Sequence, residues 1–62
     1  METIVVYLDN MFANLPKTPE LERLKRELLY GMEEKYQELK HDGKSENEAI
    51  GVVISEFGNI ES

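Results

Sequence analysis

Apolar residues recur at helical spacing in three segments of the chain, and turn-forming residues separate these segments. Two prolines interrupt the pattern at residues 15–19, and Gly43 lies in a second break at residues 41–44. At 100° per residue, the apolar positions of each segment fall on one face. The three faces comprise Ile4, Leu8, Met11, Phe12 and Leu15, then Leu21, Leu24, Leu28, Met32 and Leu39, then Ala49, Ile50, Val53, Ile54 and Phe57. The pattern predicts an all-α fold, a small three-helix domain with helices at residues 3–15, 19–41 and 46–57 and a long central helix.

The first segment also has strand character, because residues 4–7 read Ile-Val-Val-Tyr. A lone strand would leave its backbone N–H and C=O groups unpaired, and the rest of the sequence offers no second strand. The helical spacing therefore decides the assignment.

End signals support the central helix. Thr18 is a good N-cap, and Pro19 suits the first helical position, where its missing N–H is not needed. Gly43 can adopt the left-handed conformation that ends a helix. Lys35 lies among the apolar positions, so we expect its stem to lie along that face with the ammonium in water, and Tyr36 widens the face.

The third helix opens with a predicted capping box, in which the Ser45 side chain accepts from the Glu48 backbone N–H and the Glu48 side chain accepts from the Ser45 backbone N–H. The acidic run at residues 42–48 also looks superficially like a calcium loop. Its glycine is at the second position rather than the sixth, and position twelve is Val53 rather than Glu, so capping is the better interpretation. Gly58 is the predicted end of this helix.

Composition limits the range of functions. With 62 residues the chain has room for one small domain. Its net charge of −6 argues against non-specific binding to phosphates or anionic lipid. There is no cysteine, which removes disulfides and cysteine-based zinc sites. No apolar run approaches the roughly 20 residues of a membrane span.

The sequence gives little support for a catalytic or a DNA-binding function. His41 is the single histidine and lies at a helix end, and Glu34 and Glu38 form a carboxylate pair on a solvated face. We expect no catalytic residue, no metal ligand and no cofactor. The last helix carries no basic residue, which argues against a recognition helix, and we interpret the basic cluster at residues 23–26 as a salt-bridged surface with a Glu22–Arg26 pair.

Four apolar residues that do not belong to the three predicted core stripes are candidates for partner binding, although Leu29 among them widens the stripe of the central helix. They are Val6, Leu29, Tyr30 and Val52. Scattered exposed apolar residues are normal in soluble proteins, so a role in docking competes with no role at all. Gly31 and Gly51 each cost about 1 kcal/mol relative to Ala inside a helix, which favours close helix packing at both and, second, a backbone contact with a partner.

Several blocks of the sequence resemble a known bacterial module. They read YLDNMF at 7–12, LPKTPE at 15–20, MEEKYQEL at 32–39, GKSENEAI at 43–50 and VISEFGNI at 53–60. Together they are similar to the N-terminal helical domain of the HAAS or permease-prefix type, found in Gram-positive membrane proteins. Val5 and Val6 depart from its pattern, which leaves open an additional apolar contact, for example with a second copy.

The resemblance implies a cytoplasmic domain of a membrane protein, often associated with PadR-type transcriptional regulators, and a chain excised from a longer protein. The leading hypothesis is a non-enzymatic interaction or signalling domain that docks a regulator or a membrane-protein subunit. A homo-oligomerising assembly domain is the alternative, with Val6 and Tyr30 in the dimer seam. A third hypothesis is that the acidic chain mimics nucleic acid. This would need a uniformly negative surface, whereas residues 17–44 carry seven basic and seven acidic residues.

Overall fold

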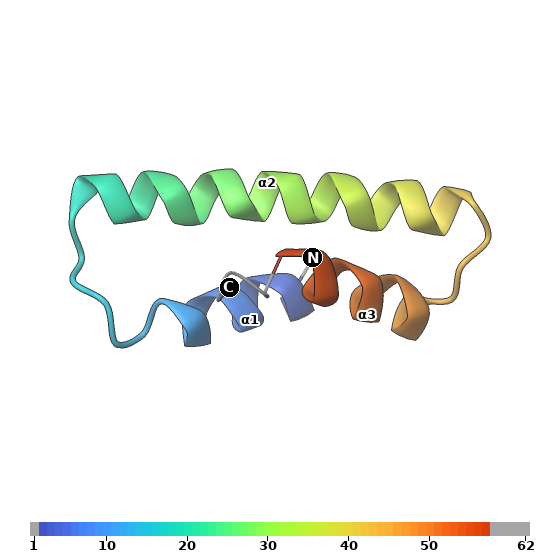
Figure 1. Ribbon diagram of the computed structural model, residues 1–62, viewed down its shortest axis with the longest axis horizontal. Coiled ribbons are helices and arrows are strands. Elements are labelled where there is room, and N and C mark those ends of the chain that lie inside the picture. The colour runs from blue at the N-terminus through green and yellow to red at the C-terminus, as the bar shows by residue number, and fades with distance from the viewer. Residues whose placement is uncertain (1, 58–62) are drawn as a thin grey trace.

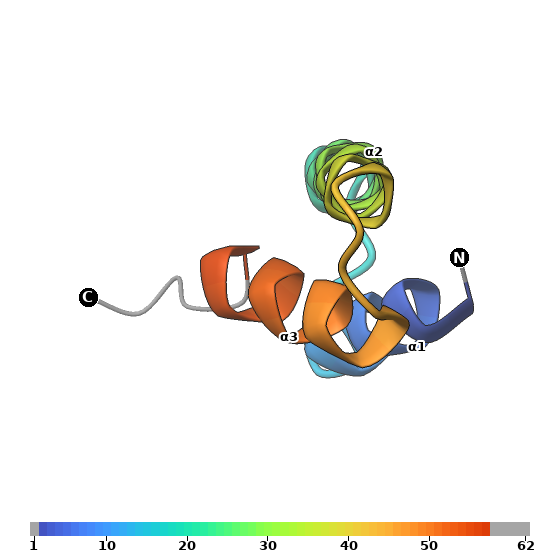
Figure 2. The same ribbon diagram turned by 90° about the vertical axis from the view of Figure 1, so that its right-hand side faces the viewer.

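The computed structural model describes residues 2–57, and this part of the chain contains three helices. They are α1 (Glu2–Met11), α2 (Pro19–His41) and α3 (Glu46–Phe57). α2 forms one layer, and α1 and α3 lie on the same side of it, α1 beneath its N-terminal half and α3 beneath its C-terminal half (Figures 1 and 2). The predicted all-α architecture with a long central helix is confirmed, and the predicted bounds of the second helix and start of the third agree with the structure.

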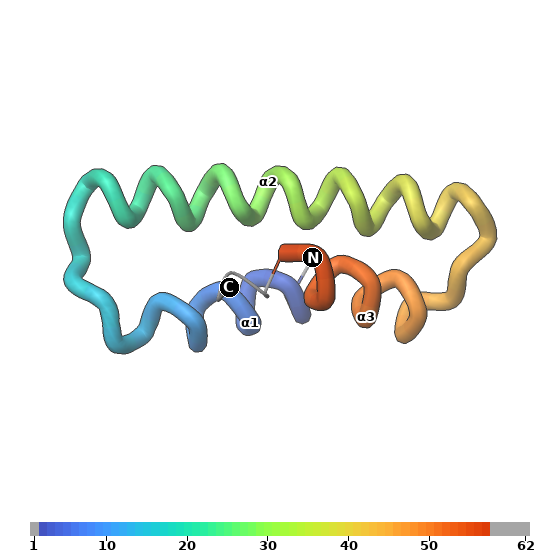
Figure 3. Tube along the Cα trace, viewed as in Figure 1, coloured from blue at the N-terminus to red at the C-terminus, as the bar shows by residue number. Residues whose placement is uncertain are grey.

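The two short helices meet beneath α2 (Figure 3), and the core is formed between them and α2. Its buried side chains are Ile4 and Leu8 from α1, Met32, Tyr36 and Leu39 from α2, and Ala49 and Val53 from α3. All the buried residues of α2 therefore lie in its C-terminal half. A helix of 23 residues is about 34 Å long, roughly twice the length of α1 or α3, so neither short helix covers all of it.

The first helix is shorter than predicted, because it ends at Met11 rather than Leu15. Tight turns follow, with the Leu15 N–H donating to the Phe12 carbonyl at 3.1 Å. Leu15 precedes Pro16, and the residue before a proline disfavours helical backbone. Leu15 is consequently 43% exposed, and its assignment to the core face was wrong.

Both ends of α2 are capped as predicted. The Thr18 hydroxyl accepts a hydrogen bond from the Leu21 N–H at 3.2 Å. At the other end the Lys44 N–H donates to the Leu39 carbonyl, the Gly43 N–H donates to the Lys40 carbonyl, and Gly43 has φ +96°. This pair of bonds is a Schellman motif, which reverses the chain toward α3.

The capping box of α3 is confirmed. The Glu48 N–H donates to Ser45 Oγ at 3.2 Å, and the Ser45 N–H donates to Glu48 Oε1 at 3.1 Å. Hydrogen bonds to the Glu48 carboxylate hold its pKa below the ordinary value, chiefly the one from the Ser45 backbone N–H and then one from the Ser45 hydroxyl. Gly58, the predicted end of the helix, lies outside the described residues.

Two further side chains were assigned wrongly, one to the core and one to the surface. Leu24 was assigned to the core face but is 44% exposed, in the N-terminal half of α2, where no residue of α2 is buried. Val52, predicted to project outward, is half-buried and packs against the core. It follows Ala49 by three positions and therefore flanks the buried face instead of opposing it.

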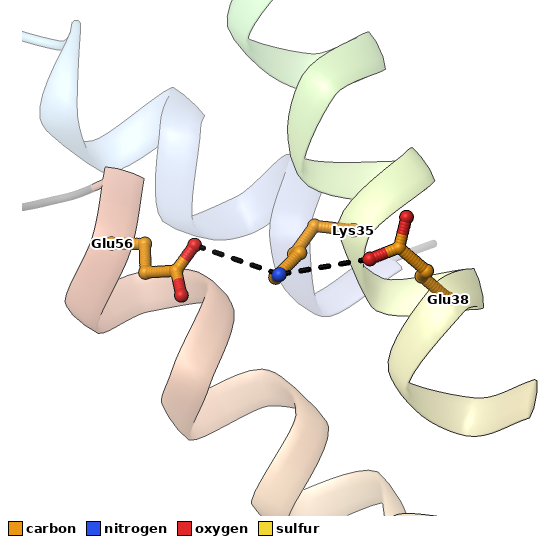
Figure 4. A network of polar contacts seen from close by, with 3 residues as sticks. All are labelled: Lys35, Glu38 and Glu56. Atoms are coloured by element: carbon orange, nitrogen blue, oxygen red, sulfur yellow. Dashed lines mark ion pairs between the residues drawn. The ribbon is translucent and has the colours of Figure 1, made fainter. Parts of the chain in front are cut away.

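Lys35 links α2 to α3 at the edge of the core (Figure 4). Its Nζ lies 3.6 Å from Glu38 Oε1 on the same helix and 4.0 Å from Glu56 Oε1 on α3. The side chain is 31% exposed, and its ammonium lies between two exposed carboxylates.

The two helical glycines have different surroundings. A Cβ added at Gly31 would lie 3.1 Å from Phe57 Cε2, so the expected close helix packing is confirmed there. A Cβ at Gly51 would meet nothing within 4 Å, and the expected packing is wrong at this position.

Candidate interaction surface

The four candidate docking residues do not form one patch. Tyr30 is 66% exposed and Val6 is 49% exposed, whereas Leu29 and Val52 are half-buried and pack against the core. Val6 lies two positions from both Ile4 and Leu8, so it points away from α2. Tyr30 lies two positions from Met32, so it points away from α1 and α3. The two exposed candidates therefore lie on opposite sides of the molecule.

Tyr30 lies at the centre of an exposed helical face, which we call the outer face of α2. This face comprises Arg23, Arg26, Glu27, Tyr30, Glu34 and Gln37. Their spacing of three or four residues places them on one side of the helix, turned away from the buried Met32, Tyr36 and Leu39. Tyrosine and arginine are the residue types that most often carry the binding energy of protein interfaces.

A shallow groove of about 260 Å³ lies between α1 and α2, next to this face. Val5, Leu8 and Leu29 supply its apolar lining, and Asp9, Glu22, Lys25 and Arg26 supply its polar lining. Leu29 therefore packs against the core and also lines the groove. Val5, which is 37% exposed, was missed as a candidate, although its place in the apolar Val5–Val6 pair was the available signal.

An ion pair closes one part of the groove and joins the two helices. Lys25 Nζ lies 2.6 Å from Asp9 Oδ1. The hydrogen bond to Asp9 is the main cause that raises the pKa of Lys25 above its ordinary value. The sequence offered no basis for this pair, because it depends on how α1 crosses α2.

The basic cluster is not salt-bridged in the predicted way. Within residues 2–57 its ion pair is the one between Lys25 and Asp9, and the expected pair between Glu22 and Arg26 does not form. Arg23, Arg26 and Glu34 make no ion pair with any described residue. The outer face of α2 thus presents charges of both signs that the fold itself leaves unneutralised.

The residues considered for catalysis and metal binding lie on the surface. Glu34, Glu38 and His41 are exposed, and Glu38 pairs with Lys35. Among residues 2–57 no group of three or more histidine, aspartate or glutamate side chains is arranged to hold a metal ion. The same part of the chain contains no helix with the length and apolar character needed to cross a lipid bilayer.

Comparison of the chain with protein-family models, with curated proteins and with solved structures finds no match. The resemblance to the HAAS or permease-prefix type therefore stays an expectation from the sequence. The functional interpretation of this chain depends on its own surface chemistry.

Proposed function

We propose that the chain is a non-enzymatic protein-interaction domain that binds its partner through the outer face of α2. The observation that carries this proposal is the 66% exposure of Tyr30 in the middle of the longest helix. This side chain contributes nothing to the core, and two arginines without ion pairs lie one and two turns before it. A large amphipathic ring beside arginines is a typical anchor of a small interface.

The adjoining groove extends the proposed surface. Arg26 lies between Tyr30 and the apolar lining of Val5 and Leu29, so a partner could cover the aromatic ring and reach the groove. Leu29 belongs to this surface, whereas Val6 and Val52 do not. Removing Val52 would disturb packing, because it contacts the core.

The sequence resemblance suggests the setting of this domain. We propose a cytoplasmic domain of a bacterial membrane protein, with a PadR-type regulator or a membrane-protein subunit as the partner and a role in signalling. The net charge of −6 supports a protein partner over direct contact with nucleic acid.

Site-specific photo-crosslinking tests the proposal. A photo-reactive benzoyl-phenylalanine in place of Tyr30 should give a discrete protein adduct in the native host. The matched control carries the same group in place of Val6, which is also exposed but lies on the opposite side. Equal adducts at the two positions, or none at Tyr30, would contradict the proposal.

Substitution gives a second readout. Tyr30→Ala should weaken capture of the crosslinked partner at least about tenfold, as expected for an aromatic anchor. Circular dichroism should show an unchanged helix content, because Tyr30 makes no core contact.

A further inference from the structure

Residues 3–8 of α1 have the composition of a β-strand although they form a helix. They read Thr-Ile-Val-Val-Tyr-Leu, and all but Leu8 are β-branched or aromatic. The run contains no charge, no glycine and no proline, which is the signature of segments that stack into cross-β assemblies. A second uncharged run, at residues 49–54, contains Ala49 and Gly51, which are depleted in strands. Residues 3–8 are therefore the stronger strand-forming segment of the two.

The helical state of this segment depends on α2 more than on its own propensity. A helix of ten residues is too short to persist alone in water, and valine, isoleucine, threonine and tyrosine are weak helix formers. The buried side chains of Ile4 and Leu8 hold α1 against α2, and the ion pair between Asp9 and Lys25 adds a polar link. When α1 separates from α2, residues 3–8 lose the contacts that keep them helical.

A change from helix to strand would change which side chains share a face. In the helix, Ile4 and Leu8 are buried together, and Val6 points away from α2 and is 49% exposed. In a strand, alternate residues share a face, so Val6 joins Ile4 and Leu8 on one continuous apolar face. Val6 is thus outside the core of the helical fold but central to the face of the strand.

We propose that residues 3–8 are a latent strand, through which the chain pairs with further copies of itself when α1 leaves α2. The backbone N–H and C=O groups of one copy then bond to those of the next, which supplies the second strand that a single chain lacks. The apolar faces of Ile4, Val6 and Leu8 pack against one another between paired sheets. This inference goes beyond the proposed function and is independent of it, because Tyr30 lies on another helix and takes no part in the pairing.

The fold and the flanking charges both oppose this pairing. Packing against α2 buries Ile4 and Leu8, and the acidic residues Glu2 and Asp9 bracket the segment. Like charges stacked in neighbouring copies repel, as gatekeeper residues do beside other strand-forming segments. We therefore expect slow assembly that becomes faster at about 1 M salt. There the charges are screened over about 3 Å, which is less than the spacing of about 4.8 Å between strands.

Fibre formation by the full chain at about 1 mM, followed by thioflavin T fluorescence and X-ray fibre diffraction, tests the proposal. Wild type should assemble and give the cross-β reflection at about 4.7 Å. Val6→Lys places a charge in the strand face, so it should lengthen the half-time of assembly about tenfold or more. In the helix the same side chain points away from α2, and lysine is a better helix former than valine, so the folded state should be kept.

Asn10→Lys is the matched control for Val6→Lys. Asn10 is also exposed on α1, and its replacement changes the net charge equally, but it lies outside residues 3–8. This variant should assemble at least as fast as wild type. Circular dichroism before assembly checks that both variants keep their helix content.

The need for α1 to open is tested from α2. Lys25→Gln removes the ion pair with Asp9 and leaves residues 3–8 unchanged. It should shorten the half-time of assembly about 1.4- to 5-fold, as expected for the loss of an exposed ion pair. Lys17→Gln is the control, because it changes the net charge equally and Lys17 makes no ion pair with any described residue.

Hydrogen exchange of the assembled chain locates the paired segment, and protection of residues 3–8 is expected. A wild-type chain that forms no cross-β assembly would overturn the proposal, as would Val6→Lys assembling as fast as Asn10→Lys. Protection confined to residues 49–54 would overturn the choice of segment. Equal half-times for Lys25→Gln and Lys17→Gln would overturn the dependence on α1 leaving α2.

Discussion

Gly31 and Gly51 occupy similar places in their helices, but their environments assign them different roles. The space that Gly31 leaves is occupied by the ring of Phe57, which brings α3 close to α2. Gly51 faces open space, so within the described chain its missing side chain is not compensated by packing. Sequence alone could not separate them, because the difference depends on where another helix crosses.

We expect Gly51→Ala to raise the free energy of unfolding by about 1 kcal/mol, because alanine is the better helix former and its methyl group meets nothing. Gly31→Ala should raise it less, since its Cβ would press on Phe57 at 3.1 Å. Urea denaturation of the two variants measures both values. Equal stabilisation would contradict the close approach of α3 at Gly31.

The capping box of α3 predicts a specific pH dependence. Because hydrogen bonds from Ser45 lower the pKa of folded Glu48, its contribution to stability is present above the unfolded pKa of about 4.3. It is lost as the pH falls through the lower pKa of the folded state. Glu48→Gln keeps an acceptor for the Ser45 N–H but does not titrate, so it is the control.

Between pH 6 and pH 3, wild type should lose more stability than Glu48→Gln. Thermal unfolding followed by circular dichroism at a series of pH values measures this difference. Parallel pH profiles for the two proteins would show that the carboxylate does not hold the cap.

At the scale of elements, the sequence predicted what local chemistry determines. The Thr18 cap, the left-handed Gly43 and the Ser45–Glu48 box each depend on residues within one turn, and all three were predicted. The failures depend on long-range placement. Leu24 has the right periodicity for a core residue but is 44% exposed, because the core is built against Met32, Tyr36 and Leu39 in the C-terminal half of α2.

Paired truncations test this account of the core. Ile4 is fully buried and is one of two buried residues that hold α1 to α2, so Ile4→Ala should cost about 2–5 kcal/mol. Leu24→Ala should change stability by less than about 0.5 kcal/mol, because Leu24 is 44% exposed. Denaturant unfolding measures both, and similar losses for the two variants would contradict the packing described.

At the scale of the whole molecule, the candidate site was only partly predictable. Exposed Tyr30 follows from the helical wheel, because it opposes the apolar face of its own helix. Its separation from Val6 onto opposite sides follows only from the layered arrangement of α2 over α1 and α3. The groove lined by Val5 and Leu29 and the Lys25–Asp9 pair likewise depend on how α1 lies against α2.

The layered arrangement leaves the outer face of α2 uncovered, and this face carries charges of both signs around Tyr30. The sequence shows these charges only as a mixed acidic and basic helix. The structure adds that Arg23, Arg26 and Glu34 make no ion pair with any described residue, and this favours the outer face of α2 as the surface available to a partner.

The most direct test of the proposed binding surface is photo-crosslinking in the native host from a benzoyl-phenylalanine in place of Tyr30 and, in a second sample, in place of Val6. Binding through the outer face of α2 predicts a discrete protein adduct from position 30 and none from position 6, because the two exposed side chains lie on opposite sides of the molecule. Equal adducts from the two positions, or no adduct from position 30, would contradict it.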